Sequence, residues 1–118
     1  MMNPVLQKAT DHFRARLDGD LNEYYVSAWD CKIYFKSVNS FREESRILNL
    51  HQQGKVTEAL VESLIVKCRD DQGKAMFRPA DRQVLLNEVD PAIIIEIAGV
   101  INEGVEQYSM DVDETVKN

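Results

Sequence analysis

Two histidines and two cysteines are the side chains of this sequence best suited to metal binding, proton transfer or nucleophilic attack. His12 and His51 each lack a second histidine three or four residues away, the spacing that places two imidazoles on one helix face as metal ligands. Cys68 falls in an apolar helical segment, where a thiol packs as a small hydrophobe, and Cys31 beside a predicted turn has no nearby base. We therefore expect structural roles for all four residues, with both thiols free in a reducing compartment rather than joined in a disulfide.

The acidic segment Asp70-Asp71-Gln72-Gly73 has the composition of a calcium loop but not its spacing. With Gly73 at the sixth position of such a loop, the first ligand would fall on Cys68 and the bidentate glutamate on Pro79. We therefore expect a turn at this segment. The chain also lacks a glycine-rich phosphate loop, a GxSxG motif and an HExxH pair. These observations predict no catalytic, cofactor-binding or metal-binding residue, and a protein that is not an enzyme.

The charge balance disfavours nucleic acid and membrane partners. The 118 residues include 14 Lys and Arg against 20 Asp and Glu, a net charge of -6, whereas neutralising phosphate requires excess positive charge. Two adjoining predicted helices, 79–89 and 91–108, resemble a helix-turn-helix in order, but the second presents isoleucines and glutamates rather than groups that read bases. No run approaches the roughly 20 apolar residues of a membrane span, and residues 1–13 lack the features of a signal peptide. We expect a cytoplasmic protein.

Six aromatic residues lie between Tyr24 and Phe41, a density that could provide a platform for stacked bases. Such platforms combine aromatic with basic side chains, and no arginine is interleaved with these aromatics. We therefore expect the cluster to form the core of a small sheet.

Hydrophobic periodicity divides the first part of the chain into a helix and a hairpin. Residues 3–17 have helical periodicity, and Pro4 suits the first helical position. Residues 23–28 and 32–37 are rich in aromatic and β-branched side chains, which predicts two antiparallel strands with Asp30 near the turn. The apolar stripe of the first helix consists of Val5, Leu6, Ala9, Phe13 and Leu17.

Two helices are expected after the hairpin. Ser40 and Glu43 fit a capping box, which predicts a helix at 41–52 that Gly54 closes. The next helix, 56–68, is apolar over most of its circumference, as is typical of a helix at the centre of a core or in an interface. Because one small domain does not readily cover so many apolar faces, we expect a homo-oligomer.

The last third of the chain predicts two more helices and a tail. Pro79 begins a helix that extends to about residue 89, and Asp90 and Pro91 supply the cap and first residue of a helix that extends to residue 108. The acidic segment 109–118 has no periodicity and is expected to be a flexible tail. The predicted fold is therefore mainly α (α+β): residues 1–108 form a single small helical domain with an N-terminal-region β-hairpin.

The order of these elements resembles that of the tail assembly chaperones of long-tailed bacteriophages. That family places a tryptophan before a short strand, then an acidic turn with glycine, a connection ending in phenylalanine, an aspartate, and an apolar last helix. The resemblance covers residues 5–104. The chain differs from the family at two places: Asp30 occupies a position where glycine is common, and Arg78-Pro79 occupy the position where Ser or Thr usually caps the next helix. The matching positions are Trp29, Ile33-Tyr34-Phe35, Asp71-Gln72-Gly73-Lys74, Phe77, Asp81 and residues 93–101.

The resemblance implies a non-catalytic chaperone that binds and solubilises the tape measure protein during tail morphogenesis. It also implies a location in the cytoplasm of the bacterial host, in phage infection or from a prophage, and absence from the mature virion. In that family a programmed ribosomal frameshift near the end of the reading frame adds a domain that recruits the tail tube protein. A holding chaperone needs apolar surface for its client and net charge for solubility, and the sequence offers both.

The composition also fits a second class of protein. A small acidic adaptor or regulator could dock one folded partner, for example a nucleic-acid-binding protein whose basic surface it covers. Charge-steered docking weakens as the salt concentration rises, whereas apolar contacts with a helical client survive high salt. Salt dependence therefore separates the two functions.

Overall fold

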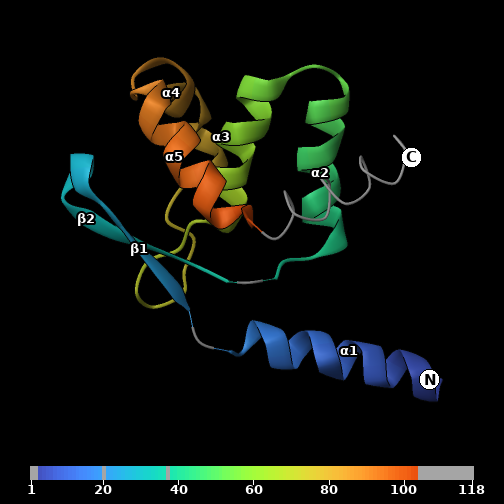
Figure 1. The fold of residues 1–118 in the computed structure, drawn as a ribbon. Helices are drawn as coiled ribbons and strands as arrows, with labels where there is room; N and C mark the ends of the chain where they lie inside the picture. Colours follow the sequence, from blue (N-terminus) through green and yellow to red (C-terminus); the bar gives the residue numbers. More distant parts are fainter. Residues whose placement is uncertain (1–2, 20, 37, 104–118) are drawn as a thin grey trace, which may run out of the picture.

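The structure, a computed structural model, describes residues 3–19, 21–36 and 38–103. Within them, five α-helices accompany one antiparallel hairpin, which confirms the predicted mainly α (α+β) class (Figure 1). None of the helices in this part of the chain is both long and apolar enough to cross a membrane. The elements are α1 (Pro4–Leu17), β1 (Asn22–Val26), η1 (Ser27–Trp29), β2 (Cys31–Phe35), α2 (Phe41–Gln52), α3 (Val56–Lys67), η2 (Pro79–Asp81), α4 (Arg82–Asn87) and α5 (Pro91–Ile101).

The hairpin is shorter than its sequence predicts. Strand β1 ends at Val26, which pairs with Cys31, although the periodicity extends the first strand to residue 28. The difference arises because Ser27–Trp29 form one turn of 3₁₀ helix between the strands. Asp30 then adopts a left-handed backbone with φ 49°, which aspartate tolerates better than most residues, and so occupies the predicted turn.

The segment that follows α3 extends this small sheet. The Tyr34 amide donates to the Arg69 carbonyl over 3.0 Å, and the Arg69 amide donates to the Tyr34 carbonyl over 2.7 Å. Arg69 also forms an antiparallel bridge with Ala75 on its own segment. These bridges attach the hairpin to the helical part of the chain.

Helix α3 lies at the centre of the helical part and packs against α2, α4 and α5. Its side chains are covered by these neighbours: Val61 is 2% exposed and Leu64 is fully buried. The expectation of a central helix is confirmed. Because the chain itself covers α3, this helix gives no independent reason for self-association. The core around it consists of Val26, Ile33, Val61, Leu64, Ile65, Cys68, Leu85, Ile94, Ile97, Ala98 and Ile101.

Local capping signals set the ends of several helices. The Ser40 hydroxyl accepts from the Glu43 amide over 3.2 Å while the Glu43 carboxylate accepts from the Ser40 amide over 3.1 Å, so the predicted capping box begins α2. The Asp90 carboxylate accepts from the Ala92 amide over 3.0 Å, and Pro91 is the first residue of α5, as predicted. The described part of α5 ends at Ile101, so the predicted end at residue 108 and the tail 109–118 lie outside the described residues.

The predicted helix at 79–89 is wrong at both ends. Pro79–Asp81 form a 3₁₀ turn, and the α-helix that follows, α4, is only six residues long. The Asp81 carboxylate accepts from the Arg78 amide over 2.8 Å, which holds the chain in this tighter turn before the α-helix begins. The short α4 leaves room for a second helix, α5, to cross the same side of α3 (Figure 1).

Candidate functional site

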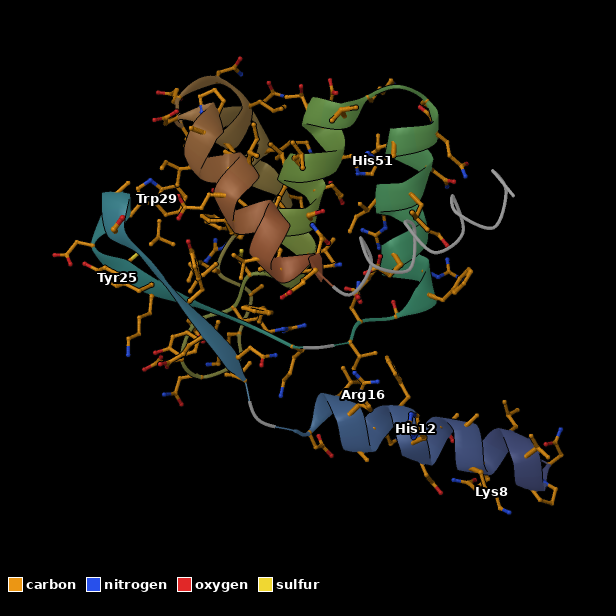
Figure 2. The ribbon with its side chains drawn as sticks, in the orientation of Figure 1. Lys8, His12, Arg16, Tyr25, Trp29 and His51 are labelled. Atoms are coloured by element: carbon orange, nitrogen blue, oxygen red, sulfur yellow. The ribbon has the colours of Figure 1, made fainter. Side chains whose placement is uncertain are left out.

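The histidines and cysteines that could carry chemistry lie apart. Figure 2 shows His12 on α1 and His51 on α2, well apart from each other in space. Both side chains are exposed. Cys31 is an exposed free thiol, whereas Cys68 is a buried one. Burial raises the pKa of the Cys68 thiol from 9.0 to about 12, so it stays protonated at neutral pH. No group of three His, Cys, Asp or Glu among the described residues could hold a metal ion.

The acidic segment after α3 forms the predicted turn. Asp70 Oδ1 accepts from the amides of Gln72 and Lys74 over 2.8 and 3.0 Å, and Gly73 has a φ of 81° that favours glycine. The Asp70 carboxylate is therefore used by the backbone of the turn itself.

The aromatic residues of the hairpin divide between the core and the surface. Tyr24, Trp29 and Phe35 pack against the core, as expected. The expectation is wrong for Tyr25, which is 51% exposed, and for Phe41, which is 85% exposed at the first turn of α2. Phe41 belongs to the capped helix rather than to the sheet, so sheet alternation does not govern which way it faces.

Two tyrosine hydroxyls on the hairpin donate to carboxylates. Tyr24 Oη lies 2.6 Å from Glu96 on α5, and Tyr25 Oη lies 2.6 Å from Asp30. The hydrogen bond to Glu96, burial and the Glu96 charge raise the pKa of Tyr24 above its usual 10.0. The hydrogen bond to Asp30 is the main cause of the raised pKa of Tyr25. Both phenols therefore remain neutral at physiological pH and serve as hydrogen-bond donors.

An apolar groove between α3, α4 and α5 is a candidate binding surface in the part of the chain that the structure describes. It encloses about 110 Å³, and a cavity of about 150 Å³ holds a benzene ring in other proteins, so one large apolar side chain is close to its capacity. Ile95 lines the groove and is 57% exposed, whereas Ile94 beside it reaches the core. The groove is lined by Thr57, Leu60, Leu85, Leu86, Val89, Pro91, Ile94 and Ile95.

Carboxylates accompany the groove, and Arg82, the first residue of α4, is paired with Glu62 on α3. Residues 83–103, which supply most of the groove, contain four carboxylates and no lysine, arginine or histidine. Glu88 and Asp90 flank Val89, one of the lining residues, and both side chains are exposed. The groove therefore suits a partner with apolar side chains flanked by basic ones.

Helix α1 is the second unusual surface. Its predicted bounds are confirmed, and Asn3 caps it by accepting from the Leu6 amide over 2.7 Å. Yet none of its residues is buried: Val5 is 76% exposed and Leu6 is 47% exposed. Figure 1 shows α1 lying apart from the helical part, joined to it through the start of β1.

Basic side chains accompany the exposed stripe of α1. Lys8, His12 and Arg16 are spaced four residues apart, which places them within about 80° of one another around the helix. Arg14 adds a further positive charge, and Asp11 is the single acidic residue of the helix. Helix α1 thus combines a partly exposed apolar stripe with excess positive charge.

Comparison of the chain with protein-family models, with curated proteins and with solved structures finds no match. The functional proposal therefore rests on the geometry and charge of the groove and of helix α1.

Proposed function

We propose that this chain is a non-catalytic tail assembly chaperone of a long-tailed bacteriophage, which holds the tape measure protein while the tail is built. The apolar groove of α3, α4 and α5 is the client-binding surface, and it is the observation that carries the proposal. A groove between helices accepts the apolar face of an amphipathic helix, with anchors at helical spacing. The tape measure protein is a long helical client of that kind, and the order of elements from Trp29 to the last helix supports the family.

The acidic rim supports the same role. Carboxylates around an apolar groove keep an open binding surface soluble and favour basic residues beside the client's apolar anchors. The histidines and cysteines of the described residues take no part in this role, which needs only binding.

Co-expression with the tape measure protein tests the proposal. The wild-type chain should keep the client soluble and co-purify with it. Ile95→Glu places a charge on the open wall of the groove at a position exposed enough to tolerate it, and should lower the co-purified client about tenfold or more, because an unpaired charge against an apolar anchor is costly. Phe41→Glu is the matched control, since Phe41 is an exposed apolar residue outside the groove. Equal client recovery from both variants would reject the groove as the client-binding surface.

An acidic adaptor that docks a folded basic partner is the alternative, and the run of four carboxylates without a basic residue at 83–103 favours it. Raising NaCl from about 0.1 M to about 1 M separates the two, because screening weakens charge-steered docking and leaves apolar contacts intact. The chaperone complex should survive the higher salt concentration, and loss of the complex there would favour the adaptor.

The proposal extends to a longer form of the chain. A frameshift product would add a domain after the tail 109–118 and bring the tail tube protein to the held client. Mass spectrometry of phage-producing cells should then find a minor longer product with this N-terminal sequence in the host cytoplasm, and neither form in finished virions. Absence of the longer product would remove the tail tube partner and leave the client-binding role in place.

A further inference from the structure

Helix α1 is an amphipathic helix with no buried residue in the part of the chain that the structure describes. It has 14 residues, and isolated helices of about 12 to 15 residues are only marginally stable in water. Its apolar stripe is exposed at Val5 and Leu6 and half-buried at Phe13 and Leu17. A helix of this kind gains stability when a second surface covers its apolar side.

The groove of α3, α4 and α5 matches α1 in both apolar character and charge. The groove accepts one large apolar side chain, and Leu6 on α1 is an exposed side chain of that kind. The segment 83–103 carries only negative charge, whereas α1 carries three basic residues and one acidic residue. The opposite charges of the two surfaces favour docking of α1 in the groove. Pairing of groove with groove, or of α1 with α1, would bring like charges together and is disfavoured.

Helix α1 lies away from the groove of its own chain. Residues 18–21 connect α1 to β1, and four residues span at most about 14 Å even when fully extended. In Figure 1, α1 lies at the opposite end of the molecule from the α4–α5 connection, which borders the groove. The short connection holds α1 away from its own groove and leaves it free to reach a neighbour.

We propose that, when no client is bound, α1 of one copy docks in the apolar groove of a second copy. We call helix α1 the arm and this contact an arm exchange. Two copies can exchange arms to form a closed dimer, or several copies can join in a row. This contact puts α1 on the proposed client-binding surface. The inference therefore rests on the proposed function in one respect, which is that a client must displace α1 in order to bind. Self-association and client binding then oppose each other.

Two full-length variants test the arm exchange. Leu6→Glu disables the arm and keeps the groove, whereas Ile95→Glu disables the groove and keeps the arm. Each variant alone should self-associate about tenfold or more weakly than the wild type in sedimentation analysis. Mixed together they should form a 1:1 complex, because the intact arm of the Ile95→Glu chain fits the intact groove of the Leu6→Glu chain.

The control variant is Ala15→Gln, which adds a side chain of similar size without a charge on the side of α1 opposite Leu6, nine residues away at 100° per residue. It should self-associate as the wild type does. Lys8→Glu combined with Arg16→Glu is a second arm variant that leaves the apolar stripe intact, and it should also weaken self-association. Circular dichroism should show the helices of the domain kept in every variant, since all the altered side chains are exposed. A small loss of helix is expected where α1 no longer docks, because an isolated helix of this length is only marginally stable.

Other results contradict the arm exchange. A strictly monomeric wild type would overturn it, as would a mixture of the two variants that stays monomeric. Self-association unchanged by Ile95→Glu would indicate pairing of α1 with α1, and self-association unchanged by Leu6→Glu would indicate pairing through the groove alone. Client co-purification with Leu6→Glu tests the proposed function separately, because this variant keeps the groove open and should hold at least as much client as the wild type.

Discussion

Glu44 and Lys67 form an ion pair that joins α2 to α3 where both side chains are largely enclosed. Lys67 Nζ lies 2.6 Å from Glu44 Oε1 and donates to Asn102 Oδ1 over 2.6 Å, and the two charged side chains are 6% and 19% exposed, respectively. Removing one partner of such a pair leaves the other charge buried and unpaired. On the other side of α3, Glu62 accepts from Arg82 Nη2 over 2.8 Å, so charged contacts fix the central helix to its neighbours.

Glu44→Gln keeps the shape of the side chain and removes its charge. We expect the free energy of unfolding to fall by about 2 to 3 kcal/mol, because Lys67 is left without its counter-charge. Denaturant titration of the purified variant measures this change. Glu23→Gln is the control, since Glu23 pairs with Lys32 over 3.4 Å at an exposed position and should cost less than about 1 kcal/mol. Equal losses from the two variants would contradict a buried pair.

The Cys68 thiol makes stability depend on alkaline pH. Its pKa is raised by burial from 9.0 to about 12, so between these values the folded chain holds a proton that the unfolded chain releases. The free energy of unfolding is therefore at its full value below pH 9 and should fall as the pH rises from about 9 to about 12. Denaturant titrations at pH 8 and pH 10 measure the decline.

Cys68→Ala is the control for this pH dependence. It loses packing at every pH, but it should reduce the decline between pH 8 and pH 10. A small decline should remain near pH 10, because Tyr24 and Tyr25, whose pKa values are raised from 10.0 in the folded chain, begin to ionise there when the chain is unfolded. An equally steep decline in the variant would assign the pH dependence to another group.

At the scale of elements, α3 organises the helical part and α1 does not contribute to it. Helix α3 contacts α2, α4 and α5, and most of its side chains are buried, whereas α1 has no buried residue. The stability of the domain should therefore depend strongly on α3.

Val61→Asp tests the central position of α3. Val61 is 2% exposed, so a carboxylate there would lie in the core without a partner, and we expect the chain to unfold at room temperature. Val56→Asp in the first turn of the same helix is the control: Val56 is 52% exposed, and an acidic residue suits a helix N-terminus. Circular dichroism should show helix lost in the first variant and kept in the second. A folded but dissociated Val61→Asp protein would instead place α3 in an interface.

Elements with local end signals could be predicted from the sequence, and those without could not. The capping box of Ser40 and the Asp90-Pro91 pair fix the starts of α2 and α5 through contacts within four residues. The start of α4 depends on the Asp81 carboxylate, which turns back to the Arg78 amide and produces a 3₁₀ turn that periodicity does not reveal. Strand β1 stops early for a similar reason, because Asp30 adopts a left-handed backbone.

The candidate site could be predicted only in part. At 100° per residue Ile95 falls on the same side of its helix as Glu103 rather than on the apolar stripe, and it is exposed. The groove itself depends on how α3, α4 and α5 cross, and residues as distant in sequence as Thr57 and Ile95 line it. The exposure of α1 is equally hard to predict from the sequence, because an apolar stripe of helical spacing normally lies against its own chain.

At the scale of the whole molecule, charge is divided between two surfaces. The net charge is -6, yet α1 carries three basic residues against one acidic, and residues 83–103 carry four acidic residues and no basic one. An even distribution would serve solubility equally well. The division instead provides complementary surfaces at opposite ends of the molecule, one of them lined by apolar side chains (Figure 1).

Site-specific photocrosslinking in phage-producing cells tests the central claim most directly. A photoreactive residue at position 95 lies on the open wall of the groove, and the same residue at position 41 lies on an exposed apolar site of α2. We predict that position 95 crosslinks to the tape measure protein and that position 41 does not. The absence of a crosslink to the tape measure protein from position 95, or equal crosslinks from both positions, would contradict a client held in the groove.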